Sequence, residues 1–265
     1  MKTSFETICL QLGESDGLFK RYCLNSYKHE FFRYYMAMRR YEVIKYFFCR
    51  YLKKSNSILD VGCGVGEYLK YAIGNNRTVV GVDLDKFQIK NKICDFIAVQ
   101  CDASYLPFTS ESFDLILFSE VLEHLPFPAR ALEEISRVLK PGGVLLVSTP
   151  SKNSIYEKQY LVFLVQFAIR ILQKLLGRKV QDNVGHISLQ SPQDIKKMLK
   201  EKKFKVLSEH YRGFCIPFTG ELLNFFFRFK LVVKMYLSID TYINKKKSLA
   251  GLNWSMIFLC QKCLN

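Results

Sequence analysis

A glycine-rich turn and two acidic residues have the types and spacing that could bind a nucleoside-like ligand. The segment Ile58–Gly66 reads ILDVGCGVG, an apolar stretch followed by the spacing G-x-G-x-G. Glycine is needed where the backbone turns with positive φ or approaches a ligand with no Cβ in the way. Asp83 ends the next apolar stretch, where a carboxylate can accept hydrogen bonds from both hydroxyls of a ribose. Asp102 follows the third apolar stretch, where a carboxylate can accept a hydrogen bond from the exocyclic amine of adenine.

A second group of chemically active residues follows a fourth apolar stretch, in the sequence SEVLEH. It contains Glu120, Glu123 and His124, and two carboxylates with an imidazole could bind a divalent ion that acidifies a hydroxyl. Glu120 and His124 are also candidates to take the proton of an oxygen nucleophile. The alternative is that Glu123 and His124 cap the following loop. His186, in the segment GHISLQSP, is a further catalytic candidate, and a structural role suits it equally well.

The elements that must position these residues follow an alternating order of strands and helices. Strands that are apolar throughout, rather than alternating, indicate a parallel sheet covered on both faces. Ligands of such sheets bind where the strands end, and the acidic residues all follow strand ends. A helix is expected to begin at Ser191, the N-cap, with Pro192 in its first position. The expected strands are 58–61, 78–82, 96–100, 113–118, 143–148, 204–210 and 254–260. The expected helices are one that starts at 67–72, one at 129–139, and the one that begins at Ser191 and continues through 195–203.

The segments flanking this pattern are apolar and basic. Residues 28–54 carry apolar side chains at helical spacing, which predicts one or two helices before the main fold. Ile155–Leu176 and Glu221–Ile239 predict two further apolar helices with basic residues around them. The longest uncharged part of the first, Gln159–Ile169, is shorter than the roughly 20 residues that cross a bilayer. Such helices either lie in a membrane interface or form a lid over the sheet.

Length and charge are compatible with one α/β domain that carries insertions. The chain has 265 residues and a net charge of +15, and the positive excess lies in residues 1–54 and 151–265, whereas 55–150 are net acidic. Basic flanks indicate an anionic neighbour such as phospholipid, RNA or a phosphorylated substrate, and solubility alone is the alternative. Nine scattered cysteines and no leading apolar segment predict a cytoplasmic protein with free thiols. The pair in CQKC lacks the second pair that a zinc site needs.

These motifs together resemble a known family over about residues 40–150. ILDVGCGVG, VVGVD, QCDA, FDLILFSEVLEHL and LKPGGVLLVSTP are similar to the successive motifs of class I S-adenosylmethionine-dependent methyltransferases of the type 11 group. The resemblance implies a Rossmann-like seven-stranded sheet, mostly parallel with its last strand antiparallel. A nicotinamide-binding unit and an inactive methyltransferase-like domain are the alternatives. The implied contacts to S-adenosylmethionine are Asp60, Gly62, Cys63, Gly64, Gly66, Asp83, Leu84, Asp102, Ala103 and Ser119.

The expected domain organisation follows from the same resemblance. Residues 1–54 form an N-terminal helical extension, and residues 55–265 form the methyltransferase domain. Helical insertions, acting as a lid, are expected at about 152–180 and 218–245.

The acceptor is suggested by a narrower similarity. SEVLEH resembles the S/E-x-x-E-H segment of ubiquinone-biosynthesis O-methyltransferases, which implies a divalent metal at Glu120, Glu123 and His124. The insertion after STP is similar to one that contacts lipid in that group. We therefore expect an enzyme that methylates an oxygen of a small or lipid-linked acceptor, of quinone-precursor or glycan type, and that is peripheral on the cytoplasmic membrane face. An RNA methyltransferase is an alternative that the missing N-P-P-Y, D-P-P-Y and Pro-Cys motifs disfavour, and an inactive cofactor-binding partner protein is another.

Overall fold

The computed structural model describes residues 31–74, 76–154, 187–214 and 253–264, together with five separate residues between 235 and 243. His186 and the apolar segment Ile155–Leu176 lie outside the described residues, as does most of Glu221–Ile239. None of the helices in the described ranges is long and apolar enough to cross a membrane.

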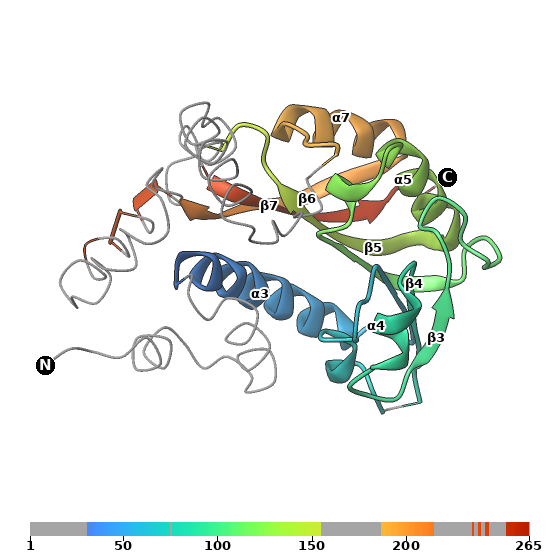
Figure 1. The fold of residues 1–265 in the computed structure, drawn as a ribbon. Helices are drawn as coiled ribbons and strands as arrows, with labels where there is room; N and C mark the ends of the chain where they lie inside the picture. The colour runs from blue at the N-terminus through green and yellow to red at the C-terminus, as the bar shows by residue number, and fades with distance from the viewer. Residues whose placement is uncertain are drawn as a thin grey trace, which may run out of the picture.

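Seven strands form a single sheet in the order β3-β2-β1-β4-β5-β7-β6 (Figure 1). The pairs from β3 through β5 are parallel, whereas β7 is antiparallel to both β5 and β6. The expected fold, a mostly parallel sheet with its last strand antiparallel, is confirmed. The strands are β1 (Ser57–Val61), β2 (Thr78–Asp83), β3 (Ile97–Gln100), β4 (Phe113–Ser119), β5 (Leu139–Pro150), β6 (Phe204–Phe214) and β7 (Asn253–Lys262).

Helices cover both faces of the sheet (Figure 1). On one face lie α5 (Pro128–Val138) and α7 (Pro192–Glu201), whose buried side chains share a core with strands β1, β2, β4, β5 and β7. On the other face lies α3 (Phe31–Leu52), which buries apolar residues at helical spacing against the sheet. Its buried side chains are Ala37, Met38, Tyr41, Ile44, Phe48 and Leu52. In the predicted range 28–54, the described residues thus form one long helix, Phe31–Leu52, that shares the core of the sheet.

The start of α7 shows how local sequence sets an element boundary. Ser191 Oγ accepts a hydrogen bond from the Asp194 N–H, and the Asp194 carboxylate accepts from the Ser191 N–H. This reciprocal capping box, with Pro192 in the first turn, satisfies backbone donors that a helix start leaves free. The predicted N-cap is confirmed.

Two predicted elements differ from the structure. The helix expected at 67–72 is only a short 3₁₀ turn, η1 (Leu69–Tyr71). Gly66 and Gly74, with φ of 89° and 91°, bound this segment and leave little room for further helical turns. The strand expected at 143–148 is longer, because β5 already begins at Leu139; within it, pairing with β4 jumps from Leu139 to Val144 and Gly142 has φ 75°.

Candidate functional site

The ends of the parallel strands form one edge of the sheet, which we call the carboxyl edge. Asp60, near the end of β1, is only 2% exposed. None of the hydrogen bonds between described residues reaches its carboxylate. Burial first, and then the neighbouring charge of Asp83, raise its pKa from 3.8 to about 8. A buried acid of this kind suits a cationic group of a ligand, because a positive charge would offset the cost of desolvation.

The glycine turn that follows β1 is fastened to β2. The backbone N–H groups of Gly62 and Cys63 donate to the Val82 carbonyl at 2.8 and 2.9 Å. Gly62 and Gly64 have φ of 76° and 53°, which residues with a Cβ rarely adopt. A Cβ on Gly62 would also overlap the Val121 side chain. The positive φ values and the overlap with Val121 explain why glycine occupies these positions of the turn.

Asp83 connects the turn to the second strand tip. Its Oδ2 accepts a hydrogen bond from Gly64 N–H at 2.8 Å, and its Oδ1 accepts from Asp85 N–H at 2.9 Å. Each carboxylate oxygen can accept a second hydrogen bond, so hydroxyl groups of a ligand can still bind. Leu84, next in the chain, is 69% exposed, which leaves its apolar side chain free to pack on a planar base.

The third strand tip brings Asp102 and Ala103 to the same edge. Cys101 N–H donates to the Asp83 carbonyl at 3.2 Å, which joins this tip to that of β2. Asp102 Oδ1 accepts from Ser104 N–H at 2.7 Å, and Ala103 is buried. The structure therefore gathers the predicted cofactor residues of the first three strands along the carboxyl edge.

The fourth strand tip carries a polar cluster. Ser119 and Ser148 share a hydrogen bond between their hydroxyls at 2.9 Å. Glu120 has φ 57°, and its Oε1 accepts from Ser148 Oγ at 2.9 Å. Its Oε2 lies 2.7 Å from Nη1 of Arg40, a residue of α3. Glu120 is thus held by two different elements.

Glu123 and His124 occupy the following turn, η2 (Leu122–His124). Glu123 is only 1% exposed, and its Oε2 accepts from Thr149 Oγ1 at 3.0 Å. Burial first, and then Glu120, raise its pKa from 4.5 to about 8. The His124 side chain is 41% exposed, and its Nε2 lies 3.9 Å from Glu123 Oε1. This arrangement places a partly exposed imidazole beside a buried carboxyl group.

The backbone of Glu123 has a structural role as well. Its carbonyl accepts hydrogen bonds from the N–H groups of Ile187 and Ser188 at 2.9 and 3.0 Å. The segment at Ile187 and Ser188 is thereby fixed beside η2.

The expected metal site is not formed by these side chains. Across the described ranges, no group of three His, Cys, Asp or Glu side chains is arranged to hold a metal ion. Glu120 is paired with Arg40, whereas Glu123 points into the protein toward Thr149. The expectation of a metal at Glu120, Glu123 and His124 is corrected on this geometry.

Sequence reasoning missed residues that complete the cluster from distant segments. Arg40 is separated from Glu120 by 80 positions, and its guanidinium also lies over the Trp254 ring, 5.8 Å from the centroid. Ser148 and Thr149 belong to the STP motif, which the sequence indicates only as part of the family resemblance. The position of Arg40, directly before Tyr41 in the helical pattern of apolar residues, is the one local signal that could have pointed to it.

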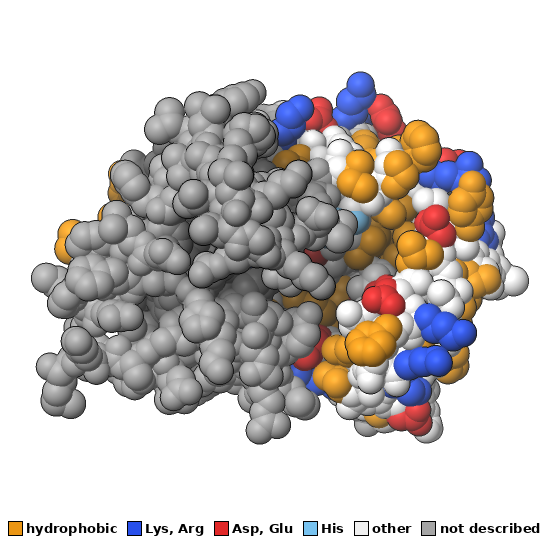
Figure 2. Space-filling view, in the orientation of Figure 1, with side chains coloured by type: hydrophobic (Ala, Val, Ile, Leu, Met, Phe, Trp, Pro, Cys, Tyr) orange, Lys and Arg blue, Asp and Glu red, His pale blue; other side chains and the backbone are white. Residues whose placement is uncertain are grey.

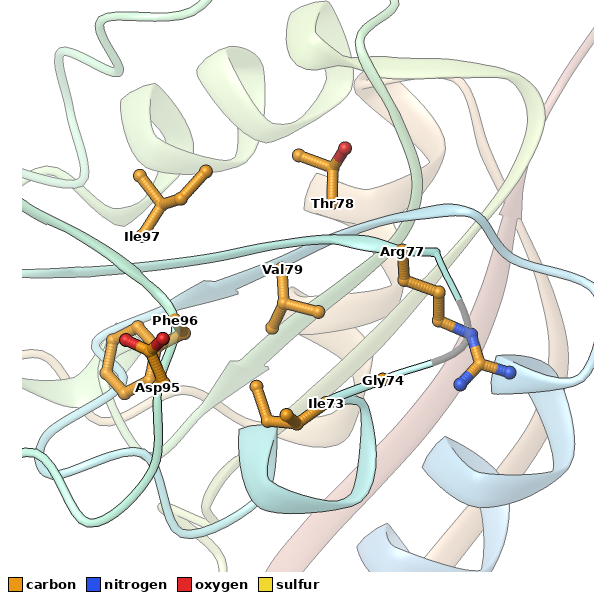
Figure 3. Close-up of a pocket in the computed structure, with 8 residues that line it drawn as sticks. All are labelled: Ile73, Gly74, Arg77, Thr78, Val79, Asp95, Phe96 and Ile97. Carbon is orange, nitrogen blue, oxygen red and sulfur yellow. The ribbon is translucent and has the colours of Figure 1, made fainter.

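A cavity of about 320 Å³ lies elsewhere on the molecule (Figure 3). Thr78 and Ile97, which line it, begin β2 and β3, so the cavity opens at the edge opposite the strand tips. Arg77 in its wall is occupied by hydrogen bonds to the Ser55 and Leu52 carbonyls. It contains none of the predicted site residues.

Comparison with known proteins identifies the family. A family model of a methyltransferase domain matches residues 27–209. The chain belongs to this methyltransferase family. Together with the fold, this identifies a class I S-adenosylmethionine-dependent methyltransferase.

Similar proteins agree with this assignment. The methyltransferase is 31% identical over 153 residues to a ubiquinone biosynthesis O-methyltransferase of Thiobacillus denitrificans, covering 54% of this chain and 62% of the relative. It is 27% identical over 168 residues to a demethylmenaquinone methyltransferase of Staphylococcus aureus, covering 58% and 69%. A solved S-adenosylmethionine-dependent methyltransferase from Archaeoglobus fulgidus shares the fold, with a TM-score of 0.54, 21% identity and coverage of 83% and 94%.

The residues of the carboxyl edge fit the cofactor of this family. The methionyl part of S-adenosylmethionine carries an ammonium group and a sulfonium, and the buried carboxyl group of Asp60 can compensate a cation. The turn at Gly62 and Gly64 allows close approach of the backbone, and Asp83 retains acceptor capacity for ribose hydroxyls. The carboxyl edge thus offers groups that can complement a cationic group and the ribose of the cofactor.

Proposed function

We propose that this methyltransferase transfers a methyl group to an oxygen of a small or lipid-linked acceptor, of quinone-precursor or glycan type. The observation that carries the proposal is the exposed His124 imidazole, backed by the buried Glu123 carboxyl group, beside the strand tips of the cofactor edge. The names of the two relatives, one a ubiquinone biosynthesis O-methyltransferase, support a quinone-type acceptor.

The chemistry asks little of the protein beyond positioning and proton removal. The bound cofactor supplies an electrophilic methyl group on a sulfonium. Holding the acceptor oxygen in line with that methyl group can lower the barrier by about 7–11 kcal/mol. His124 accepts the proton of the acceptor hydroxyl, since an imidazole exchanges protons near neutral pH. Glu123 lies behind the ring, with its Oε1 3.9 Å from His124 Nε2, and limits the orientations that the ring can adopt.

Glu120 has a different role from His124 in this scheme. Its Oε2 is held by the ion pair with Arg40 and its Oε1 by the hydroxyl of Ser148, so the carboxylate is fixed in place. Each of its oxygens retains capacity for a further hydrogen bond. Glu120 therefore accepts a hydrogen bond from the acceptor and orients it.

A parallel turnover assay tests this proposal. Purified protein is incubated with labelled S-adenosylmethionine and, separately, with small phenols and catechols, lipid extract and RNA. We expect transfer to a phenol or a lipid component. His124→Ala should lower the rate about 10²–10⁴-fold and leave cofactor affinity by calorimetry unchanged. Wild-type turnover in His124→Ala would overturn the role of the imidazole.

Two alternatives make different predictions in the same assay. The basic segments 1–54 and 151–265 favour RNA as an acceptor, and labelled RNA would support that function. Binding of S-adenosylmethionine without transfer to any of the acceptor classes would instead indicate a non-catalytic partner protein. His186 remains a predicted second catalytic residue, which the same assay tests with His186→Ala.

We further propose that the protein works on the cytoplasmic face of a membrane. The apolar, basic segments 155–179 and 221–239 support this, because anionic lipid contributes about 1 kcal/mol per Lys or Arg near the surface. Co-sedimentation with anionic vesicles at low salt, lost at high salt, is expected. Failure to sediment at low salt would contradict membrane binding.

A further inference from the structure

The ion pair between α3 and the tip of β4 is largely shielded from water. Arg40 Nη1 lies 2.7 Å from Glu120 Oε2, and the two side chains expose only 15% and 19% of their surface. The Arg40 guanidinium also lies over the Trp254 ring at the start of β7, 5.8 Å from its centroid. Shielded pairs are screened weakly by salt, and the loss of one partner leaves the other charge uncompensated.

Glu120 adopts a backbone conformation that other contacts must maintain. Its φ of 57° is left-handed, which is unfavourable for a residue with a Cβ. Its backbone N–H donates to the Ser148 carbonyl at 2.9 Å, and its Oε1 accepts from Ser148 Oγ at the same distance. Strained residues of this kind persist only where their surroundings fix them, and they concentrate at functional sites. Arg40 supplies the one charged contact in this set.

Arg40 also acts on the second carboxyl group of the cluster. Burial and the charge of Glu120 raise the pKa of Glu123, and Arg40 lowers it. The same guanidinium therefore offsets the repulsion between two acids that stand three positions apart. Removing it would disturb both the orientation of Glu120 and the charge balance beside His124.

We propose that Arg40 is a positioning residue of the transfer site: through its ion pair it holds Glu120 in the orientation that receives the acceptor. The inference rests on the proposed function. The proposal gives α3 an indirect role in the chemistry, because Arg40 acts through Glu120 and need not touch the reacting groups. The neighbouring Arg39 offers a matched control, because it pairs with Glu42 on the same helix at 3.1 Å.

The first measurement separates binding from turnover. Arg40→Ala should lower kcat by about tenfold to hundredfold, because a small misplacement of an orienting group has effects of this size. The KM for S-adenosylmethionine and the Kd for S-adenosylmethionine should each change by less than about threefold. Arg40→Lys keeps the charge without the planar fork and should recover part of the rate. Arg39→Ala should remain within about twofold of wild type, as expected for a partly exposed pair.

A double-mutant cycle tests the route through Glu120. If Arg40 acts only by holding this carboxylate, Arg40→Ala combined with Glu120→Gln should be no slower than the slower single variant. Additive losses would show that Arg40 acts independently, which overturns the proposal.

The second measurement needs no acceptor. Trp254 is the only tryptophan of the chain, so intrinsic fluorescence reports on the group beside Arg40. Emission and iodide quenching of Trp254 should change in Arg40→Ala and in Glu120→Gln, and stay unchanged in Arg39→Ala. Unchanged Trp254 signals in both of the first variants would overturn the proposal even without a known acceptor.

The two levels of inference fail in different ways. A wild-type protein that shows no heat with S-adenosylmethionine contradicts the proposed function. A wild-type protein that turns over, with Arg40→Ala at wild-type kcat or Arg39→Ala equally slow, contradicts only the role of Arg40. Melting temperatures of all variants identify any loss of rate that comes from unfolding.

Discussion

Replacing Gly62 by alanine imposes two separable costs on the cofactor turn. The residue has φ 76°, and a Cβ would overlap the Val121 side chain. A left-handed conformation costs about 1–2 kcal/mol for a residue with a Cβ. Overpacking adds about 1–3 kcal/mol, and restriction of the unfolded chain returns about 0.4–1 kcal/mol. We expect Gly62→Ala to lower the free energy of unfolding by about 2–4 kcal/mol.

Two other glycines isolate each cost. Gly74 has φ 91° with no atom within 4 Å of a built Cβ, so Gly74→Ala carries the conformational cost alone and should lose about 1 kcal/mol or less. Gly81 lacks a positive φ, but its Cβ would meet Phe96 Cε2 at 2.6 Å and Cys63 Sγ at 2.8 Å. Gly81→Ala therefore measures the contact cost, about 1–3 kcal/mol.

Urea denaturation followed by circular dichroism and Trp254 fluorescence provides the assay. Val121→Ala in the Gly62→Ala background should recover the contact part of the loss and leave the conformational part. Calorimetry with S-adenosylmethionine should show weaker binding in Gly62→Ala than in Gly74→Ala. A Gly62→Ala protein as stable as Gly74→Ala, or no recovery with Val121→Ala, would refute this reasoning.

Three further predictions concern charges and a helix cap. The pKa of Asp60 rises on folding from 3.8 to about 8, so the folded state holds a proton that the unfolded state releases, and stability without cofactor should fall as pH rises through this window. Asp60→Asn should abolish that fall in thermal melts at pH 5 and 8 and weaken cofactor binding. Burial opposes ionisation of Asp114, but hydrogen bonds from Lys140, Ser57 and Asn56 outweigh it and lower the pKa to about 2. Asp114→Asn should therefore cost about 1 kcal/mol at pH 7 after solvent screening, and the difference from wild type should vanish as pH falls from about 4 to 2. Ser191→Ala should cost about 1 kcal/mol in urea denaturation, whereas Ser191→Asp should be neutral, because aspartate also caps.

The strands and their tips could be predicted from local sequence. Apolar runs such as Ile58–Val61 and Phe113–Phe118 are long enough for buried parallel strands, and polar residues mark where they end. Both strands are observed. Ser191 with Asp194 identifies a helix start from four residues. Asp60, Asp83 and Asp102 lie together because parallel strands end at one edge, which the order of strands alone implies.

The remaining features depend on contacts that no local pattern encodes. Arg40 meets Glu120 across 80 positions, and neither residue type nor spacing identifies that partner. The short turn η1 depends on glycine conformations that the helical pattern of residues 67–72 does not reveal. The metal expectation failed because two acids only three positions apart point in different directions: Glu120 toward α3, and Glu123 toward Thr149.

The interior place of β7 has a consequence for biosynthesis. Residues 253–262 enter the sheet between β5 and β6, although both of those strands are made earlier. Until a nascent polypeptide has emerged past residue 262, β5 and β6 each lack β7 as a hydrogen-bonding neighbour. Completion of the sheet must then wait until this part of the chain emerges from the ribosome, and until that moment the unpaired strand edges are available to chaperones or to aggregation.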